Sequence, residues 1–164
     1  MVVNSCVEQG IYVVLILSLE KEHQPLRSTE LSTILSVSDS YLKKILRKLV
    51  LADIITSQPG KDGGFQLTRS VEEISIYDVY CALEGQECGL KSSGIGERIF
   101  VYGKDYFQEE KKVVSVFERA NEAFLDELRK FCLSELVSRE HYLSGTIDFG
   151  KLTGGSDNHS SRRD

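Results

Sequence analysis

Basic side chains are concentrated in one stretch of a chain that is acidic overall. Residues 38–61 contain five lysines and arginines and two aspartates, a net charge of +3, whereas the whole chain of 164 residues carries −5. Lysine and arginine neutralise phosphates and release the counterions bound to them. The stretch therefore suits a phosphate backbone, which the remainder of the chain, at −8, would repel. The five basic residues are Lys43, Lys44, Arg47, Lys48 and Lys61.

No group of residues typical of a catalytic centre is apparent. The sequence contains no phosphate-binding loop and no Ser–His–Asp arrangement. Its histidines, His23, His141 and His159, lie in polar or terminal stretches. We therefore expect that the chain is not an enzyme.

The cysteines are too scattered for a zinc site, which usually shows two close pairs of ligands. The sequence has no Cys-x-x-Cys pair, and the histidines lie far from the cysteines. We expect free thiols in a reducing cytosol and no bound metal. The four cysteines are Cys6, Cys81, Cys88 and Cys132.

The longest apolar run, Ile11–Leu17, is much shorter than the roughly 20 residues that a membrane span needs. Neither a basic leader nor a small-residue cleavage site accompanies it, so a signal peptide is not expected. The composition, 41% hydrophobic and 27% charged, is typical of a globular protein. We expect a cytoplasmic protein without a membrane partner.

Hydrophobic periodicity predicts three helices in the first third of the chain. Residues 7–19 have apolar side chains at helical intervals and are followed by a polar stretch and Pro25. Ser28 is expected to cap a short second helix. Ser38 is expected to cap a third helix with an apolar stripe on one face and four of the basic residues on the other.

After the third predicted helix, the hydrophobic pattern changes from the helical period to one typical of strands. Residues 54–57 and 65–68 flank a loop with three glycines, which predicts a hairpin. A helix over residues 75–83 follows and stops at Gly85. This element order is that of a winged helix-turn-helix, so we predict a mainly α fold with a small β-hairpin wing.

The basic helix has two interpretations. On its own, a helix with four cations on one face is usually only solvated. After a short helix and a tight turn, however, it would lie outward as a recognition helix in a major groove, with the hairpin beside the same groove. We therefore expect double-stranded DNA as a partner. The candidate DNA-binding residues are Ser28, Thr29, Ser38, Ser40, Tyr41, Lys43, Lys44, Arg47, Lys48, Gln58, Lys61, Gly63 and Gly64.

These candidates divide into three roles. The basic side chains would neutralise phosphates, and hydroxyls at helix starts would donate to phosphate oxygens. Base contacts would come from Ser40, Tyr41 or Lys44, although Tyr41 is better suited to a half-buried place in the core. The wing glycines permit close approach to DNA and are also what a tight hairpin requires.

Residues 109–131 form a long amphipathic pattern. Its apolar stripe is wider than one small domain can cover, and exposed apolar surface costs about 25 cal/mol per Å². We expect this stripe to form the interface of a homodimer; the alternative is that it folds back on the first helix. The stripe consists of Val113, Phe117, Ala120, Phe124, Leu128 and Phe131.

The pattern divides the chain into four regions. Residues 1–86 form the winged helix-turn-helix domain, and residues 87–108 form a flexible linker or effector loop. Residues 109–149 form the dimerisation helix and a C-terminal segment. Residues 150–164 form a tail that is too polar to order itself.

Six segments carry motifs that are specific as a set: Ser40–Leu49, Ala52–Ile55, Ser57–Leu67, Ile74–Val79, Ala82–Gly85 and Phe131–Leu136. Together they resemble the Rrf-two family of bacterial regulators, the family of IscR, NsrR and CymR. The resemblance spans residues 7–137 and implies a dimeric winged-helix transcription factor that binds inverted-repeat promoter DNA. It also implies a long C-terminal helix that crosses to the partner subunit, and sensing of iron–sulfur status, nitric oxide or thiol metabolites.

Three positions depart from the pattern of this family. Members with a two-iron, two-sulfur cluster have three closely spaced cysteines after the Glu-Gly motif, where this chain has Cys88 alone, so no iron–sulfur cofactor is expected. Pro59 stands where many members have an arginine before the wing glycine. Cys132 stands where a capping threonine is common, and a thiol is a poor cap.

The sequence leaves the regulatory signal open. Cys88 is a candidate redox sensor, although nearby acidic residues raise the pKa of a thiol and make it less reactive. The alternatives are a small-molecule effector bound between the DNA-binding part and the dimer helix, or no effector.

We predict a sequence-specific transcriptional regulator, a repressor that binds an inverted-repeat promoter site as a homodimer. The alternative is a winged-helix module that binds other proteins and not DNA.

Overall fold

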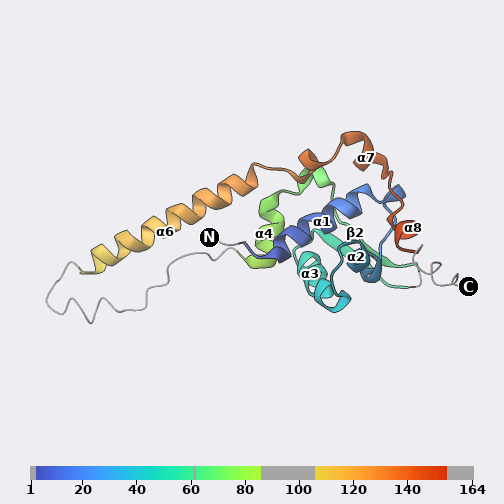
Figure 1. Ribbon diagram of the computed structural model, residues 1–164. Helices are drawn as coiled ribbons and strands as arrows, with labels where there is room; N and C mark the ends of the chain where they lie inside the picture. The colour runs from blue at the N-terminus through green and yellow to red at the C-terminus, as the bar shows by residue number, and fades with distance from the viewer. Residues whose placement is uncertain (1–2, 61, 86–105, 155–164) are drawn as a thin grey trace, which may run out of the picture.

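The computed structural model describes residues 3–60, 62–85 and 106–154 and confirms a mainly α fold with a small hairpin (Figure 1). The α-helices are α1 (Ser5–Leu19), α2 (Ser28–Ile34), α3 (Asp39–Leu51), α4 (Ile76–Glu84), α6 (Tyr106–Arg129), α7 (Arg139–Ser144) and α8 (Phe149–Gly154). The strands are β1 (Ile55–Gln58) and β2 (Gly64–Leu67), and short 3-10 helices are η1 (Lys21–His23), η2 (Val71–Glu73) and η3 (Leu133–Leu136).

Helix α1 runs through the centre of the body, which explains its apolar composition. Residues 13–18 are all buried because α3, α4, β2 and α7 pack around the helix. Gly10 lets α4 approach closely: a Cβ at this position would lie 2.5 Å from Leu83 Cδ1 and 3.0 Å from Val79 Cγ1. The short elements of the domain are therefore held by one central helix.

Helices α2 and α3 meet at a tight turn, as predicted. The backbone N–H of Val37 donates to Ser32 O at 3.0 Å, and Ser36 in the turn has a φ of 54°. The predicted cap of α3 is confirmed, because the N–H of Tyr41 donates to Ser38 Oγ at 3.4 Å. The turn and the cap together fix where α3 begins.

The predicted cap of α2 is wrong by one residue. Arg27 occupies the N-cap position, and its backbone N–H donates to the Glu30 carboxylate at 2.7 Å. A carboxylate at the third helical position satisfies the N–H of the residue before the helix. Ser28 is therefore the first helical residue, and its side chain is free for another contact.

The hairpin is shifted by one residue from the predicted strands, with Gln58 opposite Gly64. A Cβ on Gly63 would clash with Gln58 O, and a Cβ on Gly64 would lie 2.5 Å from Leu26 O. Leu26 and Phe65 also exchange two backbone hydrogen bonds, at 3.0 and 2.7 Å. The hairpin is thus attached to the segment between α1 and α2, and internal packing accounts for both glycines.

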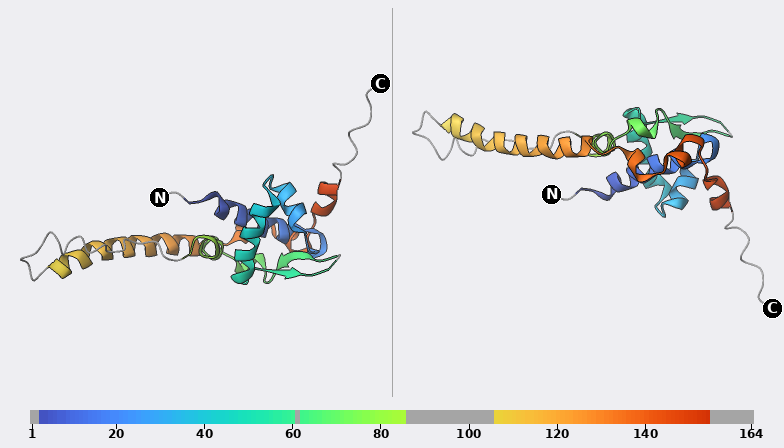
Figure 2. Two further views of the ribbon diagram at one scale, coloured as in Figure 1. Left: turned by 90° about the horizontal axis from the view of Figure 1, so that it is seen from below. Right: turned by 90° about the horizontal axis from the view of Figure 1, so that it is seen from above.

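Helix α6 projects from the body, and its C-terminal part packs on α4 (Figures 1 and 2). The rings of Phe124 and Tyr80 meet edge to face with their centroids 5.3 Å apart. The guanidinium group of Arg129 lies 4.1 Å from the centre of the Tyr77 ring. These contacts fix the direction in which the rest of α6 leaves the body.

The segment after α6 pairs with the segment that enters α4. The backbone N–H of Leu133 donates to Ile74 O at 2.8 Å. The Cys132 thiol donates to Glu72 O at 2.8 Å, and the backbone N–H of Cys132 donates to the Glu135 carboxylate at 3.0 Å. The thiol therefore serves as a donor to the carbonyls of η2, and a glutamate supplies the acceptor at the start of η3.

Residues 139–154 fold back along α1 and α2, and we call them the C-terminal strap. The buried Tyr142 donates its hydroxyl to Glu72 at 2.6 Å. Glu20, buried at the end of α1, accepts the backbone N–H of Phe149 at 2.9 Å. Because residues 150–154 belong to α8, the prediction of disorder from residue 150 is wrong for them; residues 155–164 lie outside the described part of the chain.

Candidate nucleic-acid interface

Helix α3 has one buried and one exposed face. Its buried leucine and isoleucine side chains pack into the core, which turns the opposite side of the helix to solvent. Residues three, four and seven positions apart share one face of a helix. We call the exposed polar row on this side the α3 face, and it consists of Ser40, Lys43, Lys44 and Arg47.

Lys44 and Arg47 are the cations of the α3 face that have no acidic partner among the described residues. Both are exposed. A cation without an internal partner keeps its charge available for phosphate oxygens. The structure therefore keeps the predicted phosphate-binding charge at these two positions.

Lys43 is paired within the chain. Its Nζ lies 2.6 Å from Asp39 Oδ2, one helical turn before it. The hydrogen bond from Lys43, and a second one from Ser28, lower the pKa of the Asp39 carboxyl below its ordinary value. Asp39 thus joins the start of α2 to α3. Sequence reasoning missed this role, although the four-residue spacing of Asp39 and Lys43 was a signal for the pair.

Lys48 reaches the body of the protein. Its Nζ donates to Leu83 O, in the last turn of α4, at 2.5 Å. The charge of Lys48 also lowers the pKa of Glu84, after the larger effects of hydrogen bonds from Asn4 and Cys6. A cation at this end of a helix interacts favourably with the helix dipole. Lys48 therefore stabilises the junction of α3 and α4.

The remaining candidates at the helix starts are accessible to different extents. Thr29 and Ser38 are exposed, and Ser38 Oγ lies 3.5 Å from Ser40 Oγ. Tyr41 is 36% exposed, so that part of its ring belongs to the core side and part to the surface. The hydroxyls of the cap residue Ser38 and of Ser40 and Tyr41 are therefore gathered at the N-terminal end of α3.

Fewer of the predicted DNA-binding residues lie in the described part of the hairpin than on helix α3. Gln58 is exposed at the end of β1, and Gly60 beyond it has a φ of 115°, a conformation that glycine adopts without strain. Lys61 lies outside the described residues. Gly63 and Gly64 face backbone atoms of the protein itself, so a contact of these two glycines with DNA stays a prediction.

The apolar stripe of α6 is divided between two environments. Val113 and Phe117 are 52% and 50% exposed, and Ala120 is also exposed. Phe124 and Leu128 are partly buried against the core, and Phe131, in the segment that follows the helix, is half-buried. The sequence missed Val116, which is 53% exposed in the same part of α6. The N-terminal half of the stripe is thus uncovered in a single chain.

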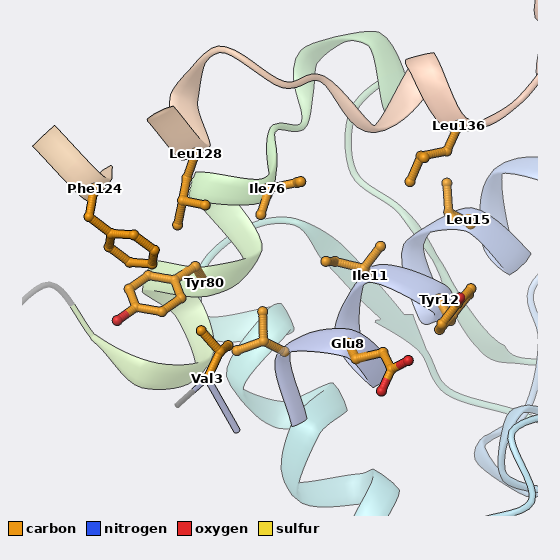
Figure 3. Close-up of a pocket in the computed structure, with 11 residues that line it drawn as sticks. Val3, Glu8, Ile11, Tyr12, Leu15, Ile76, Tyr80, Phe124, Leu128 and Leu136 are labelled. Carbon is orange, nitrogen blue, oxygen red and sulfur yellow. The ribbon is translucent and has the colours of Figure 1, made fainter. Parts of the chain in front are cut away.

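An apolar groove of about 490 Å³ lies between α1, α4 and the base of α6 (Figure 3). Tyr12 of α1 and Leu136 of η3 are half exposed and line the same end of this groove. Ile11 and Phe124 point into it from α1 and α6. A single chain therefore leaves two apolar surfaces uncovered, this groove and the N-terminal half of the α6 stripe.

The described cysteines are free thiols in separate surroundings. Cys6 donates to Glu84 Oε1 at 3.2 Å, and Cys132 donates to carbonyls of η2. Burial raises the pKa of Cys6 and of Cys81. Within the described ranges no three Cys, His, Asp or Glu side chains are grouped to hold a metal ion, and Cys88 lies outside those ranges.

A family model described as "Iron-dependent Transcriptional regulator", Rrf2, matches residues 3–139. This match covers most of the chain, including the helix-turn-helix, the hairpin and α6. The chain belongs to the Rrf2 family. Its members are transcriptional regulators rather than enzymes. Apart from its first residue, Arg139, the strap lies beyond the part of the chain that matches Rrf2.

Named relatives agree with membership of the Rrf2 family. YffB of Lactococcus lactis, named as an HTH-type transcriptional regulator, is 33% identical over 135 residues, 82% of this chain and 86% of YffB. YwgB of Bacillus subtilis, with the same type of name, is 41% identical over 100 residues, 61% of this chain and 64% of YwgB.

Solved structures show the same fold. CymR of B. subtilis, described as a global cysteine regulator, has a TM-score of 0.59 and 17% identity, with 84% of this chain and 97% of CymR covered. IscR of T. potens also has a TM-score of 0.59 and 17% identity, with 92% and 96% covered. No described helix has the length and hydropathy to cross a membrane.

Proposed function

We propose that this Rrf2-family regulator binds an inverted-repeat promoter site as a homodimer and represses transcription from it. The observation that carries the proposal is the α3 face: Lys44 and Arg47 are exposed on the second helix of a helix-turn-helix and have no internal acidic partner among the described residues. The second helix of this motif is the one that enters the major groove of DNA.

The α3 face and the helix starts would divide the work of binding. Lys44 and Arg47 would neutralise phosphates, which supplies affinity without sequence information. Ser40 and the exposed edge of Tyr41 lie at the N-terminal end of α3, from which side chains of a recognition helix contact base edges. Lys43 offsets the charge of Asp39 and prevents it from repelling phosphate.

Dimerisation is supported by two uncovered apolar surfaces. The exposed half of the α6 stripe around Phe117 would lie against a second copy of the chain, and the groove beside Tyr12 offers the apolar surface for it. Covering such surface contributes about 25 cal/mol per Å². Two copies would place two α3 helices about one DNA turn, roughly 34 Å, apart.

Repression is the simplest result of occupying a promoter, since it needs no contact beyond those with DNA. We also propose that the protein works without an iron–sulfur cluster, because Cys88 is the one cysteine in the region where cluster-binding members have three. An assay for iron and acid-labile sulfide on anaerobically prepared protein checks this part. Two or more irons per dimer would contradict it.

The salt dependence of DNA binding tests the proposed class of function. We expect log affinity for a duplex to fall linearly with log salt, by about 0.9 per neutralised phosphate. Lys44→Gln and Arg47→Gln should each make the slope less negative by about 1.8, because a dimer loses two contacts. Fluorescence anisotropy at several salt concentrations measures the slope.

Lys130→Gln is the matched control for these variants. Lys130 is an exposed cation of similar length after α6, and it pairs with Glu127 at 2.7 Å. Its replacement should leave the slope unchanged. A wild-type slope near zero would exclude DNA binding and leave the protein-interaction module as the function of the domain.

A further inference from the structure

A cavity of about 420 Å³ lies between the C-terminal end of α1, the hairpin and α7 of the strap. Strand β2 and the residues after it form one wall, and α7 forms the opposite wall. We call it the wing cavity. The part of the strap that closes it, Tyr142 and Leu143, lies beyond the region that matches the family.

We propose that the wing cavity binds a small organic anion, a monocarboxylate with an apolar body. This site is separate from the α3 face and from the α6 groove. Its ligand would join the hairpin to the strap. The consequence for DNA binding rests on the proposed function, whereas binding of the ligand does not.

The charge of the lining favours an anion. Of the described residues that line the cavity, His23 and Arg69 have basic side chains and none is acidic; His23 Nε2 lies 3.4 Å from Leu143 O. The Arg69 guanidinium forms an ion pair with Asp78, in which Nη2 lies 3.3 Å from Oδ1, and its side chain remains 33% exposed. Guanidinium groups bind carboxylates through paired, charge-assisted hydrogen bonds. Arg69 is therefore suited to hold the charged end of a ligand.

Glu72, an acidic residue beside α7, makes contacts within the chain. Glu72 accepts the hydroxyl of Tyr142 at 2.6 Å and lies 3.8 Å from Arg139 Nε. This hydrogen bond also raises the pKa of Tyr142. Glu72 thus holds the Tyr142 hydroxyl, and the Tyr142 ring remains as an apolar part of the wall.

The rest of the lining favours an apolar body on the ligand. Leu17 of α1, Leu67 of β2 and Leu143 of α7 contribute aliphatic surface from three sides. Small-molecule sites are mostly apolar and carry a few polar groups that fix orientation, and they range from about 300 to 1,000 Å³. An aromatic or branched carboxylate meets both conditions.

Such a ligand would connect parts of the chain that act on DNA with parts that do not. Gln66 and Leu67 belong to the hairpin, whereas Tyr142 and Leu143 belong to the strap. The hairpin is also attached to Leu26 by two backbone hydrogen bonds. A ligand held on both sides would restrict the hairpin and so change how the wing meets DNA.

Thermal unfolding of the full chain without DNA tests the proposal. A ligand that binds the folded state raises Tm. We expect 3-phenylpropionate to raise Tm in a concentration-dependent way, and 3-phenylpropionamide, its neutral counterpart, to have no effect. Arg69→Gln should weaken the binding of 3-phenylpropionate by about tenfold or more, since it removes a charge-assisted hydrogen bond.

Two further variants keep the test decisive if Arg69→Gln fails to fold. Leu143→Trp should fill the cavity and abolish the shift while both basic side chains stay, and Lys130→Gln, outside the cavity, should leave the shift intact. An equal effect of the acid and the amide would overturn the proposal. A panel of monocarboxylates with three to nine carbons that produces no shift would also overturn it. DNA binding, measured separately, does not enter either outcome.

Discussion

Lys44 and Lys48 lie four residues apart on one helix, yet their surroundings differ. Lys44 is exposed without an acidic partner among the described residues, whereas Lys48 donates to Leu83 O at the end of α4. A sequence shows the type and spacing of both lysines but not which carbonyl lies nearby. The predicted DNA-binding set therefore combines side chains turned outward with one that holds two helices together.

Replacing Lys48 separates these two roles. Lys48→Gln should lower the free energy of unfolding by roughly 1 kcal/mol, because the charged hydrogen bond to the end of α4 is lost. Lys44→Gln should leave stability unchanged. Urea unfolding of the two variants measures the difference. If Lys48→Gln keeps wild-type stability and reduces the salt slope as much as Lys44→Gln does, the assignment of Lys48 to the α3–α4 junction is wrong.

Glu20 gives a pH-dependent test of the strap. Burial, more than any other cause, raises the pKa of its carboxyl above the ordinary value of 4.5. The folded state therefore binds the carboxyl proton of Glu20 more tightly than the unfolded chain does. The contribution of this proton to the free energy of unfolding is lost as pH rises above 4.5. Glu20→Gln removes the buried charge and keeps an acceptor for the Phe149 N–H.

We expect the stability of Glu20→Gln, relative to wild type, to increase between about pH 5 and pH 7. Urea unfolding at the two pH values measures the change. A variant that loses stability relative to wild type as pH rises would show that the ionised carboxylate of Glu20 is favoured in the fold.

At the scale of elements, α6 holds its own domain with one end and leaves the other uncovered. Phe124 packs on Tyr80, whereas Phe117, two turns earlier, is half exposed. The packed end lies on α4, whereas the alternative placed the stripe on the first helix, and a dimer interface at the uncovered end stays a prediction. The hydrophobic periodicity of α6 predicted the apolar stripe. It cannot show at which residue along the helix the packing against the body ends.

Phe117→Glu tests the role of the uncovered half of α6. A charge placed in an apolar interface should weaken self-association by at least about tenfold, since both copies lose a buried aromatic side chain. Sedimentation equilibrium measures the association constant. Leu152→Ser is the control, because Leu152 is an exposed apolar residue on α8. Equal association of the wild type and Phe117→Glu would exclude this face from the interface.

Local patterns predicted the elements of the winged helix-turn-helix well. Ser38 caps α3 and Gly85 ends α4 with a positive φ, as expected from their types. The strap was not predicted, because its order comes from distant partners. Phe149 needs the Glu20 carboxylate and Tyr142 needs Glu72, and neither contact leaves a local signal in the sequence.

At the scale of the whole molecule, charge and shape set apart two candidate surfaces, one for the proposed DNA binding and one for the proposed dimer. The cations of α3 lie on a domain that is otherwise part of an acidic chain, and the apolar half of α6 projects away from that domain (Figure 2). A monomer would offer one recognition helix and an exposed apolar surface. A homodimer would offer two recognition helices and cover that surface, so dimerisation and DNA recognition support each other.

Hydroxyl-radical footprinting on a duplex selected from random DNA tests this account most directly. The account predicts an inverted repeat protected in two symmetric patches, with centres about one helical turn, roughly 34 Å, apart. It also predicts that Lys44→Gln combined with Arg47→Gln loses both patches while Lys130→Gln retains them. A single patch, or protection that the double variant leaves unchanged, would contradict the claim that the α3 faces of two copies bind DNA together.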